Sequence, residues 1–193
     1  MQVHHYLATA AACLVALALT ACGAAATPTA ARLGAMTCNA AGTGATITLD
    51  GKRLNYTCPK QGSYEAGLFG DPSAGAKGWQ IDEKNYQKAS NGGYQTASTT
   101  PMLISAIALI DGTKCSFAGT GATITLNGKR VNYTCPKAGS DEVALIGNIA
   151  GNITAGGQGF QIEKASYTFS QGSSTVKSSA MVPIKALDVA PLQ

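Results

Sequence analysis

Two stretches of the chain are nearly identical. Residues 38–58 read CNAAGTGATITLDGKRLNYTC, and residues 115–135 read CSFAGTGATITLNGKRVNYTC. In both, alternating polar and apolar residues lead into Asp50-Gly51 or Asn127-Gly128, and a second alternating run follows. Asp-Gly and Asn-Gly favour a type I′ turn, which needs positive φ at both central residues. Each stretch therefore predicts a β-hairpin.

The alternation also predicts which hairpin residues face the core. A two-residue turn places Leu49 opposite Lys52 and Ile47 opposite Leu54, and opposed residues share one face of the hairpin. The predicted buried face carries Ile47, Leu49, Leu54, Tyr56 and Cys58, and in the second hairpin Ile124, Leu126, Val131, Tyr133 and Cys135. The predicted solvent face of the first hairpin carries Thr46, Thr48, Arg53, Asn55 and Thr57.

The similarity continues beyond the hairpins and predicts two tandem units. It resumes at Gly78-Trp79-Gln80-Ile81, which matches Gly159-Phe160-Gln161-Ile162 after a gain of about four residues in the second copy. We assign residues 38–114 to the first unit and residues 115–193 to the second. Many short strands separated by Gly, Ser, Asn and Pro predict an all-β fold, with sandwich- or barrel-like units. Within it, 104–110 fits either a strand or a short helix.

Four of the six cysteines lie in the two units, at the ends of the repeated stretches. Their identical spacing favours the disulfides Cys38–Cys58 and Cys115–Cys135. The main alternative is Cys58–Cys115, which closes the first unit end to end. A zinc site is disfavoured because the cysteines are too far apart for metal-binding knuckles.

The N-terminal residues have the character of an export signal. Residues 7–21 are small or apolar, as in a secretory signal, although no Lys or Arg precedes them. The tetrad Leu19-Thr20-Ala21-Cys22 resembles a bacterial lipobox, which implies cleavage before Cys22 and acylation of its thiol. We therefore predict a signal peptide over 1–21 and a flexible tether over 22–37. An uncleaved membrane span is the alternative.

Composition and charge exclude several classes of function. The chain has 193 residues and only two histidines, His4 and His5, so the mature protein would contain none. That excludes catalysis by a Ser-His or Cys-His pair and any His-bound metal. The net charge of +4 is too small and too dispersed for a nucleic-acid partner. No cofactor motif occurs, and we expect no enzymatic activity. A hydrolase that uses Ser and Lys is a much weaker alternative.

Two matched features contain candidate binding residues. The basic pairs Lys52-Arg53 and Lys129-Arg130 lie beside the two predicted turns, where an anionic envelope polymer is a suitable partner. The matched aromatics Trp79 and Phe160 are candidates for a ligand platform. The structural alternatives are solubilising charges for the basic pairs and core anchors for the aromatics.

Part of each unit resembles the mycobacterial 19-kDa lipoprotein antigen family. The likeness rests on Thr48–Lys52 with Cys58–Gly70, on Thr125–Lys129 with Cys135–Gly147, and on the short Ala/Thr-rich tether. It implies an envelope antigen exposed at the surface, without enzymatic activity, whose acyl chains anchor it to the membrane and engage host receptors. The duplication and the extra cysteines depart from that family, so no disulfide pattern is carried over.

These features predict a lipid-anchored, extracytoplasmic binding protein or surface antigen. The alternative function is a carrier or sensor of a small apolar ligand held between the two units. A cavity lined by Tyr56, Trp79, Tyr133 and Phe160 would favour that alternative.

Overall fold

A computed structural model describes residues 30–41, 47–75, 77–121, 124–150 and 160–192. Within these ranges the chain is all β, as predicted, and contains no helix. Accordingly, no helix in these ranges is long and apolar enough to cross a membrane. The predicted signal peptide and Cys22 lie outside these ranges.

Thirteen strands are described, and corresponding strands of the two sequence copies follow one another in the same order. They are β1 (Ala30–Leu33), β2 (Met36–Ala40), β3 (Thr48–Leu49), β4 (Lys52–Gln61), β5 (Tyr64–Gly75), β6 (Gly78–Lys88), β7 (Tyr94–Leu109), β8 (Lys114–Phe117), β9 (Thr125–Leu126), β10 (Lys129–Ala138), β11 (Asp141–Ala150), β12 (Gln161–Ser170) and β13 (Ser173–Pro191). The segment 104–110, for which a short helix was the alternative, lies almost entirely within strand β7.

Both predicted hairpin turns are confirmed. Asp50 and Asn127 each have a φ of 50°, and the glycines that follow them also have positive φ, as a type I′ turn requires. Leu49 lies opposite Lys52, which is the predicted register. The disulfides Cys38–Cys58 and Cys115–Cys135 are confirmed as well. They join β2 to β4 and β8 to β10.

Leu49, Leu54, Tyr56 and Cys58 are buried as predicted, but they do not share one face of the hairpin. The register of β4 against β5 shifts between Leu54 and Tyr56, so Asn55 is the extra residue of a β-bulge. Leu54 then packs in a small cluster with Leu49, whereas Tyr56 enters the main core. Asn55, predicted to face solvent, is only 2% exposed.

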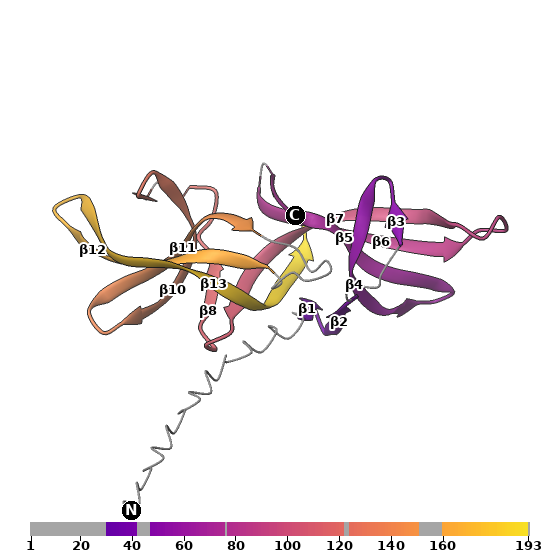
Figure 1. Ribbon diagram of the computed structural model, residues 1–193, viewed down its shortest axis with the longest axis horizontal. Coiled ribbons are helices and arrows are strands. Elements are labelled where there is room, and N and C mark those ends of the chain that lie inside the picture. The colour runs from indigo at the N-terminus through magenta and orange to yellow at the C-terminus, as the bar shows by residue number, and fades with distance from the viewer. Residues whose placement is uncertain (1–29, 42–46, 76, 122–123, 151–159, 193) are drawn as a thin grey trace, which may run out of the picture.

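The strand pairings close on themselves twice, and the two closed rings share one pair of strands (Figure 1). The first ring runs β7, β6, β5, β4, β2, β1, β13, and the second runs β7, β8, β10, β11, β12, β13. The shared pair is β7 with β13, which lie antiparallel from Met102–Pro191 to Leu109–Ile184.

The long strands β7 and β13 each serve both rings. The first half of β7 pairs with β6, and its second half pairs with β13 and β8. In the same way, β13 leaves β12 after Pro183 and continues between β7 and β1. The division of the chain between residues 114 and 115 remains a prediction. Across that division, β7 of the first copy contributes its second half to the second ring, and β13 of the second copy contributes its second half to the first ring.

Part of the predicted tether is folded, which corrects its assignment to 22–37. Residues 30–33 and 36–40 form β1 and β2, and β1 lies parallel to β13. Ala31 is fully buried in the main core. The Ala-rich sequence lacks the periodicity of a strand, but β1 is ordered by the two neighbours between which it lies.

The main core fills the space around the shared strands and draws on both sequence copies. It contains Tyr56, Trp79, Ile104, Tyr133, Phe160 and Leu187, among others. Two smaller clusters lie under the hairpins, around Leu54 in the first copy and around Val131 in the second. The residues next to each turn therefore pack in a cluster of their own, apart from the main core.

Candidate binding site at the second hairpin

The two hairpins are held to their rings by the same pair of contacts. Lys52 of the first hairpin forms an ion pair of 2.6 Å with Asp82 on β6. Lys129, its counterpart, forms an ion pair with Glu163 on β12. Both lysines, which were predicted to bind a ligand, are thus paired with a carboxylate. Each ion pair spans one intervening strand, from β4 across β5 to β6 and from β10 across β11 to β12.

The bulge asparagines form the second repeated contact. The Asn55 side-chain amide donates a hydrogen bond of 2.6 Å to the carbonyl of Gly70, and Asn132 donates one of the same length to Gly147. Gly70 has a φ of +78°, where a side chain would be strained. The buried amide of Asn55 is satisfied in this way, which explains why a polar residue lies inside.

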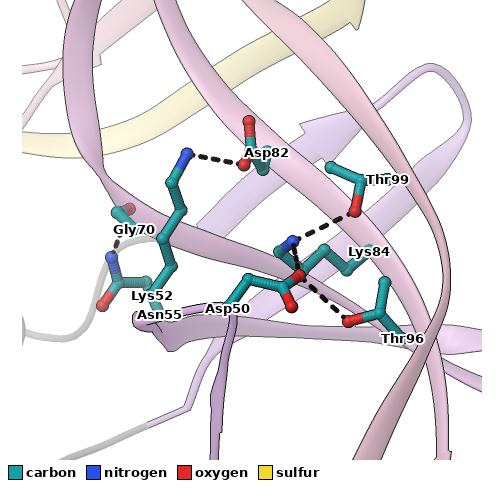
Figure 2. Close-up of polar contacts among 8 residues, drawn as sticks. All are labelled: Asp50, Lys52, Asn55, Gly70, Asp82, Lys84, Thr96 and Thr99. Atoms are coloured by element: carbon teal, nitrogen blue, oxygen red, sulfur yellow. Dashed lines mark hydrogen bonds and ion pairs between the residues drawn. The ribbon is translucent and has the colours of Figure 1, made fainter.

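The first hairpin has a further set of contacts, shown in Figure 2. The ammonium of Lys84 on β6 donates hydrogen bonds to the Asp50 carboxylate at 2.6 Å and to the Thr99 hydroxyl at 3.0 Å. Thr96 donates to the same carboxylate at 3.2 Å. The hydrogen bond from Lys84 is the main cause of a lowered pKa at Asp50. The first turn is thus fastened to β6 and β7.

The second hairpin lacks these groups. By the sequence alignment and the strand register, Asn127 replaces Asp50, Ala165 replaces Lys84 and Val176 replaces Thr96. Ala165 and Val176 belong to the small apolar cluster of this hairpin. An ionic contact in one copy is therefore replaced by an apolar one in the other.

Arg130 is held by backbone groups of the loop after β8. Its Nη2 donates hydrogen bonds of 3.2 Å to the carbonyl of Gly119 and of 2.7 Å to the carbonyl of Thr120. Both bonds use the same nitrogen, and a guanidinium has five N–H donors in all. Within the described part of the chain, the side chain is therefore oriented through one nitrogen, and its other donors can reach a ligand.

A pocket of about 600 Å³ lies beside this hairpin. That volume is within the usual range of about 300–1,000 Å³ for small-molecule sites. Its lining joins the second hairpin to the turn between β5 and β6 of the first copy: Ala74, Trp79, Gly128, Lys129, Arg130, Asn132, Ile146, Gly147, Asn148, Glu163 and Met181. A smaller hollow of about 150 Å³ shares Trp79 and Arg130 with it.

The structure brings together three of the six predicted binding residues. Lys129, Arg130 and Trp79 line the pocket, and Trp79 is also a core residue that is only 6% exposed. Lys52 and Arg53 lie at the other hairpin, and Phe160 is fully buried in the core. Sequence reasoning missed Glu163 and Asn132. The available signal was that an acidic residue and an asparagine occur at the same two positions in the first copy, as Asp82 and Asn55.

The four aromatics proposed to line an inter-unit cavity pack against the core instead. Tyr56 and Phe160 lie with their ring centres 6.2 Å apart, and both are fully buried. Tyr133 donates a hydrogen bond of 3.1 Å to the Ile104 carbonyl, and burial raises the pKa of its phenol. Of the four, only Trp79 lines the pocket at the second hairpin.

The other matched charges are paired locally. Glu65 forms an ion pair of 2.5 Å with Lys60, and Glu142 forms one with Lys137. Among the residues that the structure describes, no group of three or more His, Cys, Asp or Glu side chains is placed to hold a metal ion.

Comparison of the chain with protein-family models, with curated proteins and with solved structures finds no match.

Proposed function

We propose that this chain is a non-enzymatic lipoprotein of the cell envelope, anchored through an acylated Cys22, and that its folded part binds an anionic envelope polymer. The observation that carries the proposal is the pocket at the second hairpin. There Lys129, Arg130 and Trp79, from distant parts of the sequence, line one space of about 600 Å³. Cationic groups beside an apolar wall suit a ligand with both charge and a nonpolar face.

The start of the folded part supports a position close to the membrane. Strand β1 begins at Ala30, eight residues after Cys22. Eight extended residues span at most about 28 Å. An acylated Cys22 therefore keeps strand β1 within about 28 Å of the membrane, so that the folded part can meet polymers that start there or cross the envelope close to it.

The binding part is tested with the full-length protein in a nonionic detergent, loaded on immobilised cell-wall material and eluted with salt. Exposed charges are screened over about 8 Å at physiological ionic strength, so we expect retention at low salt and release as salt rises. A column of neutral polysaccharide is the control. Equal retention on both columns, or retention on neither, would contradict the proposal.

The anchoring part is tested separately by substituting Cys22. Stable attachment requires more than one acyl chain, at about 0.8 kcal/mol per buried CH₂. Cys22→Ser is expected to abolish the lipid-dependent mass increase and partition into the detergent phase, whereas the matched variant Cys13→Ser keeps both. If Cys22→Ser behaves like the wild type in both assays, Cys22 is not the anchor.

A further inference from the structure

We infer that the two matched basic pairs are not equivalent, and that the chain has one polyanion site, at the second hairpin, which accepts an acidic sugar. This inference rests on the proposed function and deepens it. The sequence repeats Lys-Arg beside both turns, which by itself suggests two equal sites acting together. The surroundings of the two turns differ in charge and in bonding.

The two hairpins differ in net charge. At the first hairpin, three cations, Lys52, Arg53 and Lys84, are matched by three carboxylates. Asp82 and Asp50 pair with Lys52 and Lys84, and Asp71 follows Gly70, whose backbone lies against the Lys52 side chain. At the corresponding positions of the second copy, the only carboxylate is Glu163, against the two cations Lys129 and Arg130. The first set is neutral and the second carries one positive charge. An anionic ligand is therefore attracted to the second hairpin and not to the first.

The buried ammonium of Lys84 keeps the first turn in this neutral state. Its side chain is 3% exposed, while the Asp50 carboxylate is 64% exposed and faces outward. The hydrogen bond between them holds that carboxylate ionised at the surface of the turn, where it repels an incoming anion. Asn127 at the second turn has no charge.

At the second hairpin, the cation that remains for a ligand is Arg130. Lys129 is paired with Glu163, so their charges offset each other within the pocket. Among the residues that the structure describes, the Arg130 guanidinium bonds to the carbonyls of Gly119 and Thr120 and to no carboxylate. A guanidinium held by one nitrogen presents its other donors in a fixed plane, which suits the two oxygens of a carboxylate or phosphate.

The remaining lining fits the body of a sugar ring. Met181, which is 48% exposed, and the edge of Trp79, which is 6% exposed, supply a nonpolar wall. The exposed amide of Asn148 lies in the same lining. A pyranose has one face of C–H groups and a rim of hydroxyls, so an acidic sugar meets the wall, the amide and Arg130 together. We assign the ligand to a wall or envelope polysaccharide.

The test measures the binding of fluorescein-labelled trigalacturonate to the full-length protein in nonionic detergent, by fluorescence anisotropy. Arg130→Gln removes the charged donor and is expected to weaken binding by about tenfold or more. Arg53→Gln, the matched change at the first hairpin, is expected to change the affinity by less than about twofold, since it removes no contact with the ligand. Labelled maltotriose, which is uncharged, is expected to bind at least about tenfold more weakly than the acidic probe.

Asn148→Asp gives a second variant that leaves the Arg130 contacts in place. It copies Asp71 of the first copy and neutralises the pocket, so binding of the acidic probe is expected to fall. Equal loss with Arg53→Gln and Arg130→Gln would show two equivalent sites, which overturns this inference and leaves the proposed function standing. Failure of the wild type to bind the probe, with retention on wall material intact, overturns the acidic-sugar assignment. Failure of both assays overturns the proposed function as well.

Discussion

The ammonium of Lys84 and the carboxylate of Asp50 lie 2.6 Å apart, although one is buried and the other faces solvent. They come from β6 and from the first hairpin turn. In the second copy, both positions have changed together, to Ala165 and Asn127. The pair is therefore a unit: a buried ammonium is tolerated only where the turn supplies a carboxylate, and the turn is fastened only where the ammonium is present.

This pairing predicts how substitutions at Lys84 affect stability. Lys84→Ala removes a buried side chain and releases the turn, and is expected to lower the free energy of unfolding by about 2 kcal/mol. Chemical denaturation measures the loss. Asp50→Asn is expected to be destabilising too, because it leaves the buried ammonium without a counter-charge, whereas Asn127→Asp stays within about 0.5 kcal/mol of the wild type.

The triple variant Asp50→Asn, Lys84→Ala and Thr96→Val copies the second hairpin. A loss as large as the sum of its three single variants would contradict the account.

Asp111 gives the clearest dependence of stability on pH. The hydrogen bond from Lys164, followed by the backbone N–H and hydroxyl of Thr113, lowers its pKa to about 2. A lowered pKa stabilises the folded state at pH values above the unfolded value of 3.8, and the contribution is lost as pH falls toward 2. Because Asp111 is half exposed, we expect less than about 1 kcal/mol.

The comparison that checks it is wild type against Asp111→Asn, by denaturation at several pH values. The two proteins should differ at pH 6 and converge as the pH approaches 2. A difference that stays constant over that range would show that the carboxylate charge at Asp111 contributes nothing.

Gly67 lies so close to the first hairpin that a larger residue at this position is expected to be destabilising. A Cβ at this position would lie 2.3 Å from Leu54 Cδ1 and 2.8 Å from the carbonyl oxygen of Tyr56. Gly67→Ala is therefore expected to cost about 1–3 kcal/mol. The second copy has Ala144 at this position and the smaller Val131 in place of Leu54. Adding Leu54→Val to Gly67→Ala should recover part of the loss in a thermal or chemical melt, and a double variant less stable than Gly67→Ala alone would contradict this packing argument.

Strand β1, which follows the proposed anchor Cys22, is expected to contribute to the stability of the first ring. Ala31 is fully buried between β2 and β13. Ala31→Asp places a charge in the core and is expected to cost more than about 3 kcal/mol. The exposed Thr37 on β2 is the matched control, and Thr37→Asp should stay within about 0.5 kcal/mol. If Ala31→Asp unfolds at the same denaturant concentration as Thr37→Asp, β1 does not contribute to the first ring.

The local features of the fold were predictable from the sequence because they depend on neighbouring residues. Asp50-Gly51 and Asn127-Gly128 specify the turns, and the repeated cysteine spacing specifies the disulfides. The bulge at Asn55 was not predictable from alternation, and it places Leu54 and Tyr56 in different apolar clusters while burying Asn55. The buried Asn55 amide donates a hydrogen bond to Gly70, a partner fifteen residues away that alternation does not indicate.

The sharing of β7 and β13 between the two rings also could not be predicted from the sequence pattern. The first halves of β7 and β13 are rich in Ser and Thr and do not alternate between polar and apolar residues, but pairing with β6 and β12 makes them part of both strands. The pocket depends on this sharing, because it brings Trp79 of the first copy beside Arg130 of the second. Matched residues predicted two equal sites, whereas the arrangement of the rings makes one pocket that draws on both copies.

The most direct test of the central claim is a ¹⁵N chemical-shift titration of the full-length protein in nonionic detergent with unlabelled trigalacturonate. The account predicts that the largest changes fall on the Trp79 indole N–H and on the backbone amides of Gly128, Arg130, Asn132 and Gly147, while Asp50 to Arg53 stay unchanged. Changes centred on Asp50 to Arg53, or spread equally over the two hairpins, would contradict it.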